Sequence, residues 1–217
     1  MRIRDFSPAY KALVRRNLSF FDKAQRNWEV AWQENLTPWD LKGTVCPPLV
    51  EVIEKRLVPV KDKVALVPGC GSGYECIFLR KAGFCYVTGL DLSNTAVNLA
   101  NDLLSKNPVD NLHFQAANFF TYTSLKKADF IFDYLFFSAI DPPLRPQWAK
   151  AIATNLSSDG ILCTLVFPLK RDREDASVGP PYPVTLEDYK AVLTPHFEIV
   201  HINEVCVCIW GNMFMDL

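Results

Sequence analysis

The stretch Val64-Ala-Leu-Val-Pro-Gly-Cys-Gly-Ser-Gly-Tyr74 decides the fold of this chain. Residues 64–67 form a short apolar run that predicts a buried β-strand, and residues 74–81 have the pattern of a helix. The glycines between them allow a tight turn and a close approach of a ligand to the backbone. Because the first turn of a helix also presents free amide groups, this strand–turn–helix unit predicts a binding site for a nucleotide-like ligand.

Further strands and helices are predicted to alternate downstream of this unit. Strands are expected at residues 86–91, 113–115, 130–137, 161–167 and 196–202, and helices at residues 94–104, 146–155 and 185–193. A turn at Asp159-Gly160 is expected to lead into the fifth strand. This alternation indicates an α/β fold with a doubly wound, mostly parallel sheet and helices on both faces.

The two ends of the chain and one long loop differ from this pattern. Residues 1–60 are rich in aromatic side chains and predict helices at residues 8–26 and 49–57, so we expect a helical segment ahead of a core at residues 61–217, in one domain. Residues 170–183 are charged and then rich in Pro and Gly, which indicates either an exposed loop or a border of the binding site. The apolar tail at residues 206–217 fits no regular period.

Composition and charge argue against several classes of function. The net charge of −1 is dispersed over 217 residues, which disfavours nucleic-acid binding, and no apolar stretch is long enough to span a membrane. The seven cysteines include no Cys-x-x-Cys pair and the three histidines lie apart, so we expect reduced thiols and no metal. No signal peptide is recognisable. We therefore expect a cytoplasmic protein that acts as a monomer without nucleic-acid or membrane partners.

The spacing of the glycines and one acidic residue indicate which class of nucleotide-like ligand is bound. Asp91 ends the second predicted strand, where a carboxylate can accept hydrogen bonds from both ribose hydroxyls of an adenosyl group. A dinucleotide fingerprint that begins at Gly69 and Gly71 needs a third glycine where Tyr74 stands. No Gly-Lys-Ser/Thr follows, which excludes a Walker loop. The Gly-x-Gly-x-Gly spacing is instead typical of methyltransferases that use S-adenosylmethionine, which we predict as the cofactor.

Three further positions bear on this prediction. Ala117 and Asn118 follow the third predicted strand, where the adenine edge is expected to lie. Asp133 lies in the fourth predicted strand, and two alternatives stay open: it faces the transferred methyl group, or it only caps the edge of the sheet. The run Asp141-Pro-Pro-Leu144 is similar to a motif of amino-group methyltransferases, but that motif ends in an aromatic residue. We interpret this run as a loop that enters the next helix.

The chain resembles the thiol and halide methyltransferases of plants and fungi, within the thiopurine methyltransferase superfamily. The resemblance covers about residues 25–200, and its most specific parts are the Trp-rich opening and the Val-Pro-Gly-Cys-Gly run. The matching stretches lie at residues 28–40, 66–71, 89–93, 132–142, 145–149 and 179–182. The family usually has an acid where Asn118 stands, and its C-terminal ending is usually polar and basic.

The resemblance implies a Rossmann-like class I methyltransferase fold with an N-terminal helical lid. Trp28, Trp32 and Trp39 would belong to this lid and fold over the donor, with Tyr134 beneath it. Without the resemblance, tryptophans spaced four apart are more often core residues. A physical reason supports the implied role, because aromatic faces attract a cationic sulfonium.

The predicted reaction is direct in-line transfer of a methyl group to a small thiol, bisulfide, thiocyanate or halide anion. Such anions arrive ionised, so neither a metal nor a strong base is required, and the protein supplies orientation and a dry pocket. Tyr182 either lines the acceptor pocket or packs within its loop, and Asp141 is a candidate base for thiols. Two alternatives are a methyltransferase for a bulkier, thiopurine-like thiol and a non-catalytic protein that binds S-adenosylmethionine.

Overall fold

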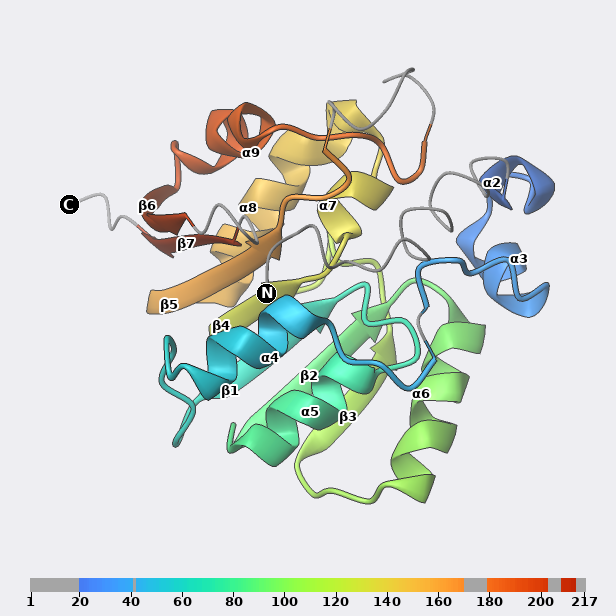
Figure 1. The fold of residues 1–217 in the computed structure, drawn as a ribbon, viewed down its shortest axis with the longest axis horizontal. Helices are drawn as coiled ribbons and strands as arrows, with labels where there is room; N and C mark the ends of the chain where they lie inside the picture. Colours follow the sequence, from blue (N-terminus) through green and yellow to red (C-terminus); the bar gives the residue numbers. More distant parts are fainter. Residues whose placement is uncertain (1–19, 41, 170–178, 203–207, 214–217) are drawn as a thin grey trace.

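A seven-stranded sheet forms the centre of the computed structural model, which describes residues 20–40, 42–169, 179–202 and 208–213 (Figure 1). The strand order is β3-β2-β1-β4-β5-β7-β6. The strands are β1 Val64–Pro68, β2 Tyr86–Asp91, β3 Leu112–Ala116, β4 Ala128–Asp133, β5 Leu156–Leu165, β6 Phe197–Ile202 and β7 Cys208–Met213. The first five strands pair in parallel, and β7 runs antiparallel to both of its neighbours. This order confirms the predicted doubly wound, mostly parallel sheet.

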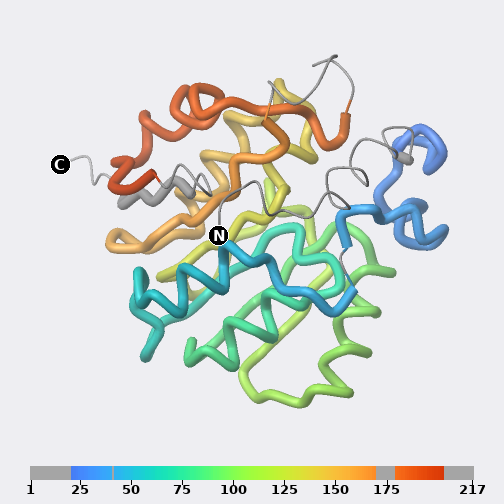
Figure 2. The backbone as a smooth tube through the Cα atoms, in the orientation of Figure 1, coloured from blue at the N-terminus to red at the C-terminus, as the bar shows by residue number. Residues whose placement is uncertain are grey.

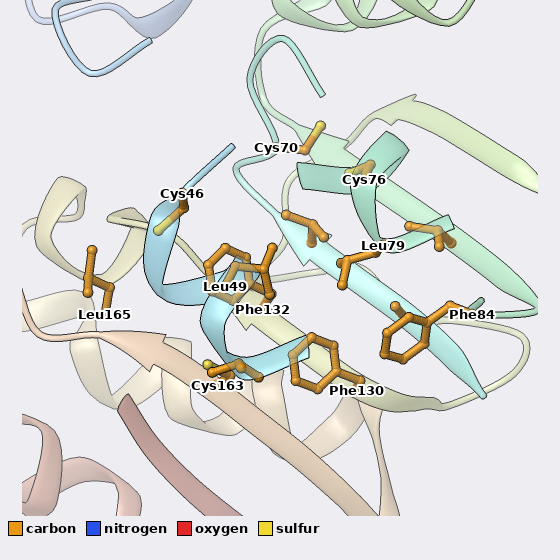
Figure 3. Packing of buried hydrophobic residues seen from close by; sticks show 14 of the residues in the cluster. Cys46, Leu49, Cys70, Cys76, Leu79, Phe84, Phe130, Phe132, Cys163 and Leu165 are labelled. Atoms are coloured by element: carbon orange, nitrogen blue, oxygen red, sulfur yellow. The ribbon is translucent and has the colours of Figure 1, made fainter. Parts of the chain in front are cut away.

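Helices cover both faces of the sheet. The helices are α2 Phe20–Lys23, α3 Trp28–Gln33, α4 Pro47–Glu54, α5 Tyr74–Ala82, α6 Asn94–Lys106, α7 Phe136–Ala139, α8 Arg145–Asn155 and α9 Leu186–Leu193, with a 3₁₀ turn at Pro142–Leu144. Side chains of α4, α5 and α6 form one buried cluster with the sheet, and side chains of α8 and α9 form a second one on the other face. Figure 3 shows the first cluster, in which Leu49 of α4 lies near Phe130 and Phe132 of β4.

The short helices α2 and α3 lie at one end of the sheet, where α3 packs beside α6 and α2 packs against α3 (Figure 2). Asn27 caps α3 because its side-chain oxygen accepts from the backbone N–H groups of Glu29 and Val30. Since α6 begins directly after the carboxyl end of β2, this arrangement places the Trp-rich segment, residues 28–40, over the ends of the parallel strands. The part of the predicted helix at residues 8–26 that precedes residue 20 lies outside the described residues.

The predicted fourth strand is too long at its carboxyl end. Strand β4 ends at Asp133, and Leu135 takes a left-handed backbone conformation with φ of 68°. The Asp133 carboxylate then accepts hydrogen bonds from the backbone N–H groups of Phe136 and Phe137, which starts α7. An apolar run predicts burial in either a strand or a helix, so its periodicity could not reveal where one ended and the other began.

Two predictions near the other end of the sheet also need correction. Strand β5 begins at Leu156, directly after α8, and its register with β4 shifts between Ala128 and Phe130. Asp159-Gly160 therefore lies in an irregular part of β5 and not in a turn before it. Part of the tail without a regular period forms β7, which pairs with both β5 and β6. The remaining predicted strands and helices agree with the structure to within about three residues.

Candidate functional site

A cavity of about 360 Å³ opens where the parallel strands end. Its wall includes Gly69 after β1, Asp91 at the end of β2, Ala117 after β3 and Tyr134 after β4. The strand order reverses between β1 and β4, and open α/β sheets bind their ligands at such a point. The cavity is therefore where this fold is expected to hold a ligand.

Most residues predicted for the site line this cavity. They are Trp28, Trp32, Trp39, Gly69, Asp91, Ala117, Asn118, Tyr134 and Asp141. Gly71 and Tyr182 are not part of the lining, but each of them donates a hydrogen bond to a residue that is. The N–H of Gly71 donates to Asp91 Oδ2 at 2.9 Å, and the hydroxyl of Tyr182 donates to Asp141 Oδ1 at 2.5 Å.

The carboxylate of Asp91 is fixed by the backbone. Its Oδ2 accepts from the N–H of Gly71 and its Oδ1 accepts from the N–H of Ser93, both at 2.9 Å. Burial raises the pKa of Asp91, although these two hydrogen bonds oppose the shift. Each carboxylate oxygen retains a second lone pair for a hydroxyl donor. The geometry therefore suits the two hydroxyls of a ribose.

The glycine-rich turn leaves no room for side chains. At Gly69, with φ of 64°, an added Cβ would lie 2.8 Å from the ring of Phe136. At Gly71, an added Cβ would lie 3.0 Å from the ring of Trp32. Aromatic rings from α7 and α3 thus approach this turn closely, so α3 packs directly against the glycine-rich turn.

The tryptophans form a connected aromatic cluster. The ring of Trp39 lies edge-on to Trp28 at a centroid distance of 5.5 Å and to Trp32 at 6.0 Å. Phe21 extends the cluster, with its centroid 4.5 Å from that of Trp28. Because Trp28, Trp32 and Trp39 also line the cavity, this cluster presents aromatic surface suited to a cationic sulfonium.

Two carboxylates attach the Trp-rich segment to the core. Glu29 accepts from the hydroxyls of Ser93 and Thr95, both at 2.6 Å, and these hydrogen bonds lower the pKa of Glu29. Asp40 accepts from the hydroxyl of Ser72 in the glycine-rich turn at 3.0 Å. Neither attachment has a signal in the sequence, because the partners lie at least 32 positions away in the chain.

Asn118 and Asp133 have local structural roles. The side-chain oxygen of Asn118 accepts from the N–H of Phe120 at 3.0 Å while the residue lines the cavity. Asp133 is fully buried outside the lining, and its carboxylate also accepts from the indole N–H of Trp148 at 2.8 Å. Burial raises the pKa of Asp133 to about 7. Of the two alternatives for Asp133, the structure therefore favours the cap over contact with a transferred group.

One cluster at the cavity joins three separate segments of the chain. Arg26 Nη2 donates to Tyr182 Oη at 3.1 Å and lies 3.9 Å from Asp141 Oδ1. Pro180 and Pro181 also line the cavity, so the loop before α9 borders it. Arg26 was not predicted as a site residue, since no spacing signal links it to a tyrosine 156 positions away.

Within the described part of the chain, no group of three His, Cys, Asp or Glu side chains could hold a metal ion. Cys70, Cys76 and Cys85 are free thiols. No helix in the described ranges is both long enough and apolar enough to cross a membrane.

Comparisons with known proteins agree with this geometry. The family model described as Thiopurine S-methyltransferase (TPMT) matches residues 23–209. The chain is 38% identical to a probable thiol methyltransferase 2 of Arabidopsis thaliana over 190 residues, which cover 86% of this chain and 80% of that protein. It is 37% identical to thiocyanate methyltransferase 1 of the same plant over 179 residues, which cover 82% of this chain and 75% of the relative.

Solved structures share the fold at low sequence identity. A magnesium protoporphyrin IX methyltransferase from Synechocystis, with S-adenosylhomocysteine bound, superposes with a TM-score of 0.67 at 15% identity, covering 94% of this chain and 99% of that one. A TehB-like methyltransferase from Corynebacterium glutamicum has a TM-score of 0.64 at 14% identity, with 84% and 98% covered. Both support the Rossmann-like class I methyltransferase fold.

Proposed function

We propose a methyl acceptor for this chain, which belongs to the thiopurine S-methyltransferase family and is an S-adenosylmethionine-dependent methyltransferase. The proposed acceptor is a small thiol, bisulfide, thiocyanate or a halide. The observation that carries this proposal is the composition of the cavity. Among the lining residues that the structure describes, only Arg26, Asp91 and Asp141 are charged, and the wall is otherwise mostly apolar and aromatic. Such a wall strips water from a soft nucleophile, which makes the nucleophile more reactive.

The residues of the cavity fit the methyl donor from its adenosyl end to its sulfonium. Asp91 would accept hydrogen bonds from the ribose hydroxyls, and Ala117 and Asn118 would border the adenine. The backbone at Gly69, in the turn that Gly71 completes, would cradle the amino-acid part of the donor. The aromatic surfaces of Trp28, Trp32, Trp39 and Tyr134 would face the sulfonium. When bound, the donor supplies an electrophilic methyl group.

The protein's own contribution to the reaction is orientation and exclusion of water. A soft anion needs no proton removal, so a pocket that holds it in line with the methyl group supplies much of the rate. Tyr182 and Asp141 lie on the side of the cavity bordered by Pro180 and Pro181, and we place the acceptor there. Residues 1–60 would then act as a lid over the core at residues 61–217.

The dispersed net charge of −1 supports a protein without nucleic-acid or membrane partners. We propose that it acts in the cytoplasm as a monomer. Size-exclusion chromatography with light scattering would test the monomer, and a dimer at micromolar concentration would contradict it.

The experiment that tests the proposed acceptor class is product analysis. Purified protein is incubated with S-adenosylmethionine and either iodide, thiocyanate or bisulfide, and volatile methylated products are measured by gas chromatography. We expect methyl iodide, methyl thiocyanate or methanethiol to accumulate together with S-adenosylhomocysteine. A thiopurine serves as the bulky acceptor. Donor binding without product from the three small acceptors would refute the proposal, and product from the thiopurine alone would favour the bulkier substrate.

A further inference from the structure

Arg26, Tyr182 and Asp141 form a hydrogen-bonded chain at the cavity wall, in a geometry that the methylation of an anion does not require. The hydroxyl of Tyr182 accepts from Arg26 Nη2 at 3.1 Å and donates to Asp141 Oδ1 at 2.5 Å. Each residue comes from a different segment: the turn before α3, the loop before α9 and the start of the 3₁₀ turn after α7. A carboxylate held by a second group, itself held by a third, is the arrangement of an oriented base.

The carboxylate of Asp141 is held through one oxygen. Both recorded partners, the Tyr182 hydroxyl and Arg26, contact Oδ1, so within the described residues Oδ2 has no hydrogen bond from the protein. The side chain is 61% exposed and lines the cavity, so a ligand there can reach it. The backbone N–H of Tyr182 donates to the carbonyl of Ser138 at 2.6 Å, and that of Leu144 donates to the carbonyl of Asp141 at 2.8 Å. These contacts fix both main chains.

Charged groups of both signs surround this chain of hydrogen bonds. From the neighbouring elements they are Asp22, which is 3.3 Å from Arg26, and Arg145 of α8, which is 4.0 Å from Asp188 of α9. The cations are thus Arg26 and Arg145. The carboxylates are Asp22, Asp141 and Asp188. Among the described residues, this side of the cavity therefore has no excess of positive charge to attract an anion, whereas a neutral thiol enters without electrostatic cost.

We propose that Asp141 is the proton acceptor for neutral thiol substrates, with Tyr182 and Arg26 as positioning residues. This inference rests on the proposed methyl transfer to small thiols and soft anions, and it divides those acceptors into two classes. Thiols need Asp141, since most alkyl thiols are protonated at pH 7. Iodide and thiocyanate carry no proton and do not need it.

The step balances without any further reactant. The thiol S–H bond breaks and its proton passes to Asp141 Oδ2. The freed sulfur electron pair forms the new bond to the methyl carbon. The bond between that carbon and the donor's sulfur breaks, and its electron pair stays on the donor's sulfur. One positive charge on the donor and one negative charge on Asp141 are lost together, and bulk water then takes the proton from the carboxyl group.

The test compares two acceptors for each of four variants of the full chain. The acceptors are 2-mercaptoethanol, which arrives protonated, and iodide, which arrives as an anion. The variants are Asp141→Asn, Tyr182→Phe, Arg26→Gln and the control Asp22→Asn, which alters a partner of Arg26 outside the cavity lining. At pH 7 we expect Asp141→Asn to lower kcat/KM for 2-mercaptoethanol on the order of 100-fold, the usual contribution of a positioned base. The two positioning variants lower it about 10-fold by the same principle.

For iodide, Asp141→Asn should lower kcat/KM at least about tenfold less than it does for 2-mercaptoethanol, since no proton is removed from iodide. Only the control Asp22→Asn should leave kcat/KM for both acceptors within about threefold of the wild type. The pH profile gives a second measurement that a structural role would not move. With Asp141→Asn, the reaction needs preformed thiolate, so kcat/KM for 2-mercaptoethanol rises about tenfold per pH unit below the thiol's own pKa. In the wild-type protein this slope should be clearly smaller, because Asp141 takes the proton from the bound thiol.

The outcomes separate this inference from the proposed function. Equal losses for both acceptors, or no loss for the thiol, overturn the role of Asp141 and leave methyl transfer intact. Wild-type turnover of iodide without turnover of 2-mercaptoethanol also overturns this inference alone. Donor binding without turnover of either acceptor by the wild-type protein overturns both proposals.

Discussion

Replacement of Asp91 by asparagine should weaken donor binding about 100-fold without unfolding the protein. The change removes the negative charge and turns one acceptor oxygen into a donor, while the shape of the side chain is kept. The two backbone N–H groups that now donate to the carboxylate, each at 2.9 Å, then compete with the ribose hydroxyls for a single oxygen. A hydrogen bond to a charged group contributes about 1.5–3 kcal/mol. The loss of one such bond and the weakening of the other cost about 3 kcal/mol, or roughly 100-fold in Kd.

Isothermal titration calorimetry with S-adenosylmethionine measures this change. Asp102→Asn is the matched control because Asp102 is an exposed aspartate on α6, and its Kd should equal that of the wild type. Burial raises the pKa of Asp91, so this carboxylate is protonated at a higher pH than an exposed aspartate would be. As the pH is lowered, the affinity of the wild-type protein for the donor should therefore fall at a correspondingly higher pH. A folded Asp91→Asn protein that binds the donor within threefold of the wild type would refute the assignment of Asp91 to the ribose.

Three further predictions concern the surroundings of the site. Glu75 is buried and its pKa is raised to about 7, so the folded state holds this proton more tightly than the unfolded state. The resulting stability is complete below the unfolded pKa and is lost as the pH rises through 7. In urea unfolding, Glu75→Gln should therefore be about 1–3 kcal/mol more stable than the wild type at pH 8 and nearly as stable as the wild type at pH 4.5. The exposed Glu54→Gln variant is the control. An equal change in the free energy of unfolding at both pH values would contradict this prediction. Glu29→Ala removes the carboxylate that joins α3 to α6, so the Kd for the donor should rise about tenfold, the equivalent of one hydrogen bond. An unchanged Kd in calorimetry would exclude α3 from donor binding. Trp148→Phe removes the indole N–H that donates to buried Asp133 and should lower the free energy of unfolding by about 2 kcal/mol; a change under about 0.5 kcal/mol would show that the carboxylate finds another donor.

The fold was predictable wherever a local pattern determined the structure. The apolar run at residues 64–67, the glycines after it and Asp91 at the end of the next strand predicted the cradle and the sheet around it. The carboxyl end of β4 was not predictable in this way. Its buried apolar residues continue into α7, and the change from strand to helix depends on backbone N–H groups that donate to Asp133. Strand β7 likewise depends on pairing with β5 and β6, which lie elsewhere in the chain.

The site was predictable in its cofactor-binding half and less so on its acceptor side. The tryptophans came from a family resemblance, because tryptophans spaced four apart predict only a buried helix face by themselves. Arg26 and Glu29 carry no sequence signal, since both contact partners far away in the chain. Such contacts exist only after the sheet has brought the ends of its strands together.

The most direct test of the central claim counts both products of one reaction. Wild-type protein is mixed with S-adenosylmethionine that carries a labelled methyl group, with and without bisulfide. S-adenosylhomocysteine and labelled methanethiol are then quantified in the same sample. We expect S-adenosylhomocysteine formation that depends on bisulfide, with one labelled methanethiol for each S-adenosylhomocysteine. A donor that binds but stays intact at every bisulfide concentration would contradict it.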